Sequence, residues 1–179
     1  MKINNLSFKY DNKVVFNHLN LDLNEDRIYL MAKSGEGKTT LLRLIAGLIK
    51  PDSGYIDNEY KKIAMMFQED RLLKWLNVKD NLMIINDDED RVNELLKICE
   101  VDGSLNIDEL SGGMARRIAL IRALLYDGDL LLLDEPFSGM DNKLKAKMAD
   151  LILRSNEKII ASGHDEKEAE LLKAKIVSL

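Results

Sequence analysis

The sequence has a single cysteine, two prolines and no apolar run near the ~20 residues that a membrane-spanning helix requires. One cysteine, Cys99, excludes an internal disulfide, and its position in an amphipathic helical pattern favours a buried structural thiol. The first residues also lack the charged and then apolar pattern of a secretory leader. We therefore expect a protein of the cytosol that does not span a membrane.

An excess of positive charge is also missing. Lysine and arginine number 26 against 31 aspartate and glutamate residues, and the formal net charge of −5 offers no basic field for a nucleic-acid backbone. The sequence contains neither internal repeats nor a low-complexity linker. At 179 residues and 46% hydrophobic content, the chain is expected to fold as one domain, and we expect no nucleic acid among its partners.

What the sequence does contain is a segment suited to phosphate. Residues 32–39 read Ala-Lys-Ser-Gly-Glu-Gly-Lys-Thr and lie between an apolar run and a helical pattern. A turn between a strand and a helix aims backbone N–H groups and the positive helix end at one point. Lys38 would contact the terminal phosphates of a nucleotide, and the Thr39 hydroxyl would bind magnesium. The residues expected to contact ATP here are Lys33, Ser34, Gly35, Glu36, Gly37, Lys38, Thr39 and Thr40.

The first position of this segment departs from the pattern G-x-x-x-x-G-K-[ST], because Ala32 replaces the glycine. If the position needs a positive φ, alanine costs roughly 1–2 kcal/mol. A chance Gly-Lys-Thr in a turn is the alternative interpretation. The strand before the segment and the helix after it favour a nucleotide site, and we expect Ala32 to be tolerated.

Apolar periodicity predicts the arrangement of the rest of the chain. Alternation over residues 2–9 and 14–23, with a turn at Asp11-Asn12, predicts an antiparallel hairpin. Tyr10 lies at its tip, either as an ordinary strand-end aromatic or as a platform for a nucleotide base. Further along, short apolar runs alternate with helical patterns, and one run ends at Gln68. This alternation predicts an α/β fold with a parallel sheet.

Two carboxylates follow the apolar run of residues 130–133. A fully apolar run is typical of a central parallel strand, and Asp134 and Glu135 would then lie at the sheet edge where such folds bind ligands. Asp134 is placed to hold magnesium through water, and Glu135 to polarise an attacking water. His164 follows a second apolar strand, and it is either a contact to the terminal phosphate or a polar residue at a strand end.

Another helical pattern follows Ser111, which we interpret as the helix N-cap. Arg116, Arg117 and Arg122 fall outside its apolar stripe. They could form a phosphate or nucleic-acid patch, but a solvated face carrying ion pairs is the favoured interpretation.

Several motifs now stand in one order along the chain. Leu110-Ser111-Gly112-Gly113-Met114 resembles the LSGGQ signature with methionine in place of glutamine, and residues 130–135 resemble a Walker B strand with its catalytic glutamate. Gln68 matches the glutamine of the Q-loop, residues 138–141 match the D-loop, and His164 matches the switch histidine. Over nearly its whole length, the chain resembles the ATP-binding subunit of an ATP-binding cassette (ABC) transporter.

This resemblance implies a P-loop NTPase fold of ABC type. The core would be a mainly parallel sheet, with an N-terminal antiparallel β subdomain and a small helical subdomain at approximately residues 70–125. Residues 1–179 would form a single nucleotide-binding domain. Catalysis would rest on Glu135, His164 and Lys38, and Tyr10 and Gln68 would join the ATP contacts. Metal ligands would be Thr39, Gln68 and Asp134.

The resemblance also implies partners. The chain would form a head-to-tail homodimer or pseudo-dimer that closes on two ATP molecules with Mg²⁺. Ser111, Gly112 and Gly113 would touch the γ-phosphate bound by the other subunit, with Asp141 in the D-loop. The subunit would lie in the cytoplasm on the inner face of the cell membrane, coupled to an integral membrane permease.

A finer likeness lies in residues 68–76, which resemble the ATPases of nitrate, sulfonate and taurine importers. Met114 is usual in that group, although Lys74 stands where those proteins generally carry proline. Trp75 would help to form the surface on which the permease docks, and an extracytoplasmic solute-binding protein would be a further partner. The stretch between Gly54 and Gln68 is shorter than in most members of the family. Because the sequence ends with the last predicted strand, we expect no C-terminal regulatory domain.

Two alternatives stay open from sequence. A soluble ABC ATPase outside transport is one, although such proteins usually carry tandem cassettes or long insertions. A regulatory ATP-binding module with weak turnover, caused by Ala32, is the other. A GTPase is disfavoured because the sequence has no Asn-Lys-x-Asp or Thr-Lys-x-Asp stretch.

Overall fold

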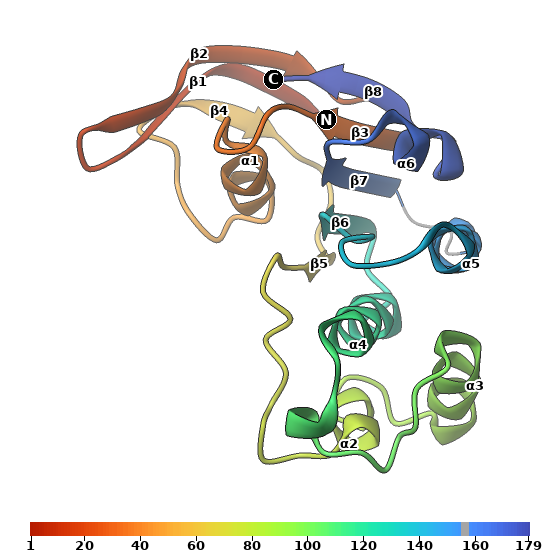
Figure 1. Cartoon of the computed structure of the whole chain (residues 1–179). Helices are drawn as coiled ribbons and strands as arrows, with labels where there is room; N and C mark the ends of the chain where they lie inside the picture. Colours follow the sequence, from red (N-terminus) through yellow and green to blue (C-terminus); the bar gives the residue numbers. More distant parts are fainter. Residues whose placement is uncertain (155–157) are drawn as a thin grey trace.

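The chain folds around two β-sheets, one antiparallel and one parallel. The computed structural model describes residues 1–154 and 158–179 (Figure 1). The antiparallel sheet has the order β2-β1-β4. Its strands are β1 (Lys2–Tyr10), β2 (Lys13–Asp22) and β4 (Ser53–Asp57). The predicted hairpin is confirmed, with its turn at Asp11, whose φ is 49°.

Within the described residues, the second sheet has five strands, and all of its pairings are parallel. Its order is β5-β6-β7-β3-β8. The strands are β3 (Arg27–Met31), β5 (Ile63–Met66), β6 (Leu130–Asp134), β7 (Lys158–Gly163) and β8 (Lys175–Ser178). The four leucines of β6 are fully buried, as their apolar run predicts for a strand covered on both faces.

The helices lie on the two faces of the parallel sheet and beyond its β5 edge. Helix α1 (Lys38–Ile45) packs between the two sheets, and α5 (Asn142–Leu153) and α6 (Glu166–Leu171) lie near β7 and β8 (Figure 1). Below β5 lie α2 (Val78–Met83), α3 (Glu89–Cys99) and α4 (Gly112–Leu125), with a 3-10 turn at Ile107–Glu109. Among the described residues, every helix is too short or too polar to cross a membrane.

Two apolar clusters fill the faces of the parallel sheet. Alternate residues of β6 separate between them: Leu131 and Leu133 join the cluster with α4 and α5, whereas Leu130 and Leu132 join the cluster with α1 and the antiparallel sheet. The strand alternation therefore builds a layered core. Its parallel strands all end at one edge, where the predicted site residues follow β3, β5, β6 and β7.

Candidate functional site

The loop between β3 and α1 has the conformation that a phosphate site needs. Gly35 and Gly37 have φ of 84° and 99°, a region that disfavours other residues. A Cβ at Gly37 would also lie 2.7 Å from Val15 Cγ1 and 2.8 Å from Phe16 Cζ, so β2 packs directly against the loop. The Lys33 N–H donates to Glu36 Oε2 at 2.7 Å, which closes the turn. In the described structure no side chain caps α1 at Gly37, so the N–H groups of its first turn are suited to an anion held by this loop.

Ala32 is outside the set of residues with positive φ. The backbone cost considered from the sequence therefore does not arise, because alanine adopts this conformation as readily as glycine does. The departure from the G-x-x-x-x-G-K-[ST] pattern leaves the loop geometry intact.

Lys38 carries a buried charge inside this loop. Its side chain is 6% exposed, and Nζ donates to the carbonyl oxygens of Ala32 at 2.8 Å and Lys33 at 3.2 Å. These contacts hold the ammonium at the mouth of the loop. An anion bound by the loop N–H groups would meet that charge directly.

The two carboxylates at the end of β6 differ in their surroundings. Asp134 is 1% exposed, its Oδ1 accepts from Ser162 Oγ at 2.6 Å, and its Oδ2 is buried without a hydrogen-bond partner among the described residues. Glu135 is half-buried with a φ of 49°, and its N–H lies 3.2 Å from both Ser162 Oγ and Ser162 O. Ser162, which sequence reasoning missed, thus positions both residues from β7.

The predicted residues meet in one pocket of about 230 Å³. The predicted lining residues are Tyr10, Ser34, Gly35, Gly37, Lys38, Thr39, Thr40, Gln68 and Glu135, and Lys13 and Val15 of β2 join them. Tyr10 is 43% exposed and packs edge-to-face on Phe8, with ring centroids 4.8 Å apart. Its exposed ring is therefore held in place, as a platform for a base requires.

Other predicted residues lie around this pocket. A neighbouring pocket of about 400 Å³ shares Gln68 and Glu135 and is also lined by Gly112 and Gly113. Ser111 caps α4, since its Oγ accepts from the Met114 N–H at 3.2 Å, and this confirms the predicted N-cap. Asp141 caps α5 in the same way at 2.9 Å. Asp134 is buried at the end of β6, next to Glu135 in sequence. Lys33, Glu36 and His164 are exposed, and His164 follows β7 at the same sheet edge.

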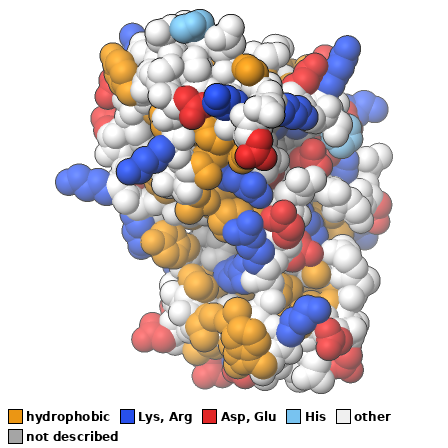
Figure 2. All heavy atoms as spheres, turned by 90° about the vertical axis from the view of Figure 1, so that its left-hand side faces the viewer, with side chains coloured by type: hydrophobic (Ala, Val, Ile, Leu, Met, Phe, Trp, Pro, Cys, Tyr) orange, Lys and Arg blue, Asp and Glu red, His pale blue; other side chains and the backbone are white. Residues whose placement is uncertain are grey.

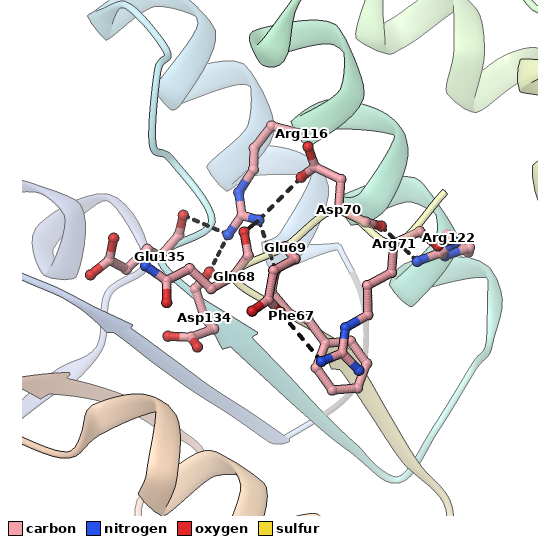
Figure 3. Close-up of polar contacts among 9 residues, drawn as sticks. All are labelled: Phe67, Gln68, Glu69, Asp70, Arg71, Arg116, Arg122, Asp134 and Glu135. Atoms are coloured by element: carbon pink, nitrogen blue, oxygen red, sulfur yellow. Dashed lines mark hydrogen bonds and ion pairs between the residues drawn. The ribbon is translucent and has the colours of Figure 1, made fainter. Parts of the chain in front are cut away.

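The prediction of a solvated arginine face on α4 is wrong for Arg116, which is buried, whereas Arg122 is partly exposed. Arg116 is 5% exposed, and its guanidinium donates to carbonyl oxygens at the ends of β5 and β6 (Figure 3). Arg122 donates to Asp70 O at 2.8 Å and Arg71 O at 2.7 Å. Burial lowers the pKa of the Arg122 guanidinium, and Asp70 opposes this effect. Periodicity finds an apolar stripe, but it does not show that polar atoms of another segment lie against the opposite face.

The donor set fits magnesium. Asp134 Oδ2 is a buried carboxylate oxygen without a hydrogen-bond partner in the described part of the chain, and Thr39 and Gln68 offer neutral oxygens at the pocket. In the described part of the chain, no group of three or more histidine, cysteine or acidic side chains is arranged for a metal. Magnesium bound with a nucleotide takes only one or two carboxylates, since phosphates supply further oxygens.

Comparison with known proteins agrees with this geometry. A sequence model of the family described as "ABC transporter" matches residues 16–138. The aliphatic sulfonates import ATP-binding protein SsuB 2 of Paraburkholderia xenovorans is 37% identical over 99% of this chain and 75% of its own length. The sulfate/thiosulfate import ATP-binding protein CysA of Mesostigma viride is 36% identical over 98% of this chain and 58% of its own length.

Solved structures give the same result for the fold. The ATP-binding cassette MJ0796, described as a dimer in a post-hydrolysis state bound to ADP and Pi, superposes with a TM-score of 0.84 at 27% identity. That match covers 99% of this chain and 93% of the cassette. A second dimeric structure of MJ0796, described as a bacterial ABC transporter cassette, gives a TM-score of 0.86 at 26% identity.

Proposed function

The chain belongs to the ABC transporter family, and on that premise we propose that it is the subunit whose ATP hydrolysis drives solute transport through a separate membrane permease. The observation that carries this proposal is the convergence of Lys38, Thr39, Gln68 and Glu135 on one pocket. These residues come from three sheet-edge segments, and they supply cation, hydroxyl, amide and carboxylate. Phosphoryl transfer to water needs that combination.

Each group has a defined task in this proposal. The loop N–H groups and Lys38 bind the phosphates, and Tyr10 stacks on the base. Thr39, Gln68 and Asp134 would hold magnesium, which neutralises charge on the phosphate oxygens when bound. Glu135 orients and polarises the attacking water, and His164 contacts the terminal phosphate. Asp134 Oδ2, a buried oxygen without a hydrogen-bond partner among the described residues, and the exposed imidazole of His164 support these assignments.

A dimer completes the site. Ser111, Gly112 and Gly113 begin α4 with a side-chain cap and two residues without Cβ, which leaves room for close approach of an anion. We assign this helix start to the ATP held by the other subunit, with the Asp141 segment between the two sites. The cassette structures that this chain resembles are described as dimeric.

The permease would dock on an exposed apolar surface near residues 68–76, the Gln68 segment. Figure 2 shows hydrophobic side chains gathered between Lys and Arg side chains on one face of the molecule. Trp75 is 78% exposed, Ile84 56% and Leu48 55%, and a groove of about 270 Å³ is lined by Leu48, Phe67 and Tyr126 among others. Exposed apolar patches of this kind favour a protein partner. The subunit then lies at the inner face of the membrane.

Three helices near this surface support a helical subdomain. Residues 70–125 include α2, α3 and α4, which pack on one another, and we propose that they form a helical subdomain within a single nucleotide-binding domain. We propose that the cargo is a small sulfonate-like anion that is imported. An extracytoplasmic solute-binding protein would deliver it. The names of the sulfonate and sulfate import relatives support this cargo.

The ATPase proposal is tested by Glu135→Gln. This change removes the base while it keeps the size of the side chain, so hydrolysis should fall by ~10²–10⁴. ATP should then stay bound, and the variant should sediment as a dimer with MgATP. Glu94→Gln, an exposed change in α3, is the matched control. Wild-type turnover in Glu135→Gln, or a monomer without bound nucleotide, contradicts the proposal.

The transport proposal is tested by pull-down of the tagged protein from detergent-solubilised membranes of its native cell. One multi-span protein recovered in stoichiometric amount, and identified by mass spectrometry, is the expected result. The identity of that membrane protein would then indicate which solute is transported. Recovery of soluble or ribosomal partners alone would replace this proposal with a soluble ABC ATPase.

A further inference from the structure

Arg116 joins two segments of the site that are far apart in sequence. It lies in the second turn of α4, and its guanidinium is buried (Figure 3). Nη1 donates to Phe67 O at 2.7 Å and to Gln68 O at 2.8 Å. Nη2 donates to Glu135 O at 2.9 Å and also to Asp134 O. One side chain therefore holds the backbone on both sides of the pocket.

These contacts lie just beyond the point where β5 and β6 stop pairing. Strands β5 and β6 pair in parallel as far as Met66 and Leu133. The guanidinium binds the carbonyl groups of the two residues that follow this last pair on each side, Phe67 and Gln68 after Met66, and Asp134 and Glu135 after Leu133. Arginine has five N–H donors in a planar fork, so it can continue the link between two chains where their own ladder stops. Lysine has no such fork.

Glu135 depends on this link. Its φ of 49° is unusual for a residue with a side chain, and such conformations persist only where the surroundings fix them. Ser162 binds the Glu135 N–H, and Arg116 binds the Glu135 carbonyl oxygen. The backbone of Glu135 is therefore fixed from two directions, by β7 and by α4, and its carboxylate lines the pocket.

The charge of Arg116 is balanced at the same place. Asp70 Oδ1 lies 3.3 Å from Nη1, and Asp70 itself follows Gln68 closely in sequence. Burying a guanidinium is costly, and apolar side chains of similar volume often serve stability as well or better. A buried charge whose contacts lie on Gln68 and Glu135 therefore indicates a task in the site.

We propose that Arg116 is a positioning residue for ATP hydrolysis. It fixes the main chain of Gln68 and of Glu135 so that both side chains face the same pocket. It also ties them to α4, the helix that begins at Ser111, so a movement of that helix changes the position of the hydrolytic carboxylate. This inference rests on the proposed ATPase function and acts through Glu135, whose carbonyl oxygen accepts from the Arg116 guanidinium.

The test compares Arg116→Lys and Arg116→Gln with wild type in steady-state ATP hydrolysis. Arg116→Lys keeps the charge and most of the volume but loses the fork, so it separates positioning from folding. We expect kcat to fall ~10–100-fold in both variants, because small misplacements of a reacting group have effects of this size. The KM for ATP should change less than ~3-fold, since the phosphate loop is untouched. Arg154→Gln, an exposed change that removes the same charge, is the control.

A double variant checks that Arg116 acts through Glu135. If it does, Arg116→Lys should lower the rate of Glu135→Gln by less than ~2-fold, because the two changes remove the same contribution. Wild-type kcat in both single variants, or a parallel loss of kcat and ATP affinity, would overturn the inference. Failure of the wild-type protein itself to hydrolyse ATP would instead contradict the proposed function.

Discussion

Single residues of the phosphate loop differ in how strictly they are required. Gly35 and Gly37 have positive φ, and Gly37 also lies against β2, whereas Ala32 has neither constraint. We therefore predict that Ala32→Gly changes the ATP dissociation constant by less than ~2-fold, because no backbone strain is relieved. Calorimetric titration with MgATP measures this.

Gly37→Ala provides the matched contrast for that prediction. Its Cβ would meet Val15 and Phe16 and would need a disfavoured φ, so ATP binding should weaken by at least ~10-fold. A marked gain of affinity in Ala32→Gly would instead mean that Ala32 impairs the loop.

Cys99 is predicted to be unreactive in the folded protein. It is fully buried, Sγ lies 3.7 Å from Met148 Sδ, and burial raises the pKa of the thiol from 9.0 to about 12. The thiolate is the reactive form, so a disulfide reagent at pH 8 should modify the native protein at least ~100-fold more slowly than the protein in urea. Rapid stoichiometric modification of the native protein would show that α3 opens readily.

At the scale of elements, three segments are joined by one buried polar group. Tyr29 of β3 donates to Glu168 Oε2 at 2.7 Å, and Lys145 of α5 donates to Glu168 Oε1 at 2.6 Å. Glu168 lies in α6, and a Cβ at Gly163 would lie 1.8 Å from the Tyr29 hydroxyl, so the group packs against the last residue of β7, just before His164. The helices after Asp141 and His164 are thereby fixed to the strand before the phosphate loop.

Glu168→Ala should therefore destabilise the fold. It leaves the Lys145 ammonium and the Tyr29 hydroxyl without their partner, at a cost of ~2–4 kcal/mol because breaking a buried pair leaves a charge uncompensated. Urea unfolding followed by circular dichroism measures the loss. Glu170→Ala, an exposed change in the same helix, is expected to stay within ~0.5 kcal/mol of wild type.

The same group predicts a dependence of stability on alkaline pH. Burial and the contact with Glu168 raise the pKa of Tyr29 above its ordinary value of 10.0. The unfolded state then releases the phenolic proton at a pH where the folded state keeps it. This contribution to stability is complete below pH 10 and is lost as the pH rises above it, by up to ~1.4 kcal/mol per pH unit.

Tyr29→Phe isolates that contribution. It removes the titrating group, so its free energy of unfolding should fall less steeply than that of wild type above pH ~10, although other groups titrate in both proteins. Equal slopes for the two proteins would show that Tyr29 ionises normally in the fold.

A site residue could be predicted from sequence when the atoms that it contacts lie close to it along the chain. Residues within one continuous motif, such as Lys38 and Thr39, were found because a strand, a turn and a helix follow one another. Ser111 was found as an N-cap for the same local reason. Ser162 was missed and Arg116 was assigned to a solvated face, because their partners are backbone and carboxylate atoms of segments that only the fold brings near.

At the scale of the whole molecule, the order of the strands could not be predicted from the sequence. Alternating runs predicted a parallel sheet, but its order β5-β6-β7-β3-β8 depends on how crossover helices pack, which a periodic pattern does not specify. The short strand β4 also leaves its sequence neighbours and pairs with β1. This order places the ends of β5 and β6 side by side, which is what lets a single arginine from α4 reach both.

The exposed apolar surface gives a prediction about assembly. Trp75 is 78% exposed, and large aromatic side chains often dominate the binding energy of an interface. Trp75→Ser should reduce the amount of permease recovered with the tagged subunit by at least ~10-fold, because loss of such a contact typically costs 2 kcal/mol or more.

Tyr55→Ser is the control for this effect, since Tyr55 is a similarly exposed aromatic, 61% exposed, in β4 of the antiparallel sheet. It tests whether any loss of exposed aromatic surface lowers recovery. Equal recovery of the permease with Trp75→Ser and wild type would move the docking surface away from the Gln68 segment. Selective loss with Trp75→Ser would place the permease beside the segment that Arg116 connects to Glu135, and so give binding at the membrane a physical route to the hydrolytic carboxylate.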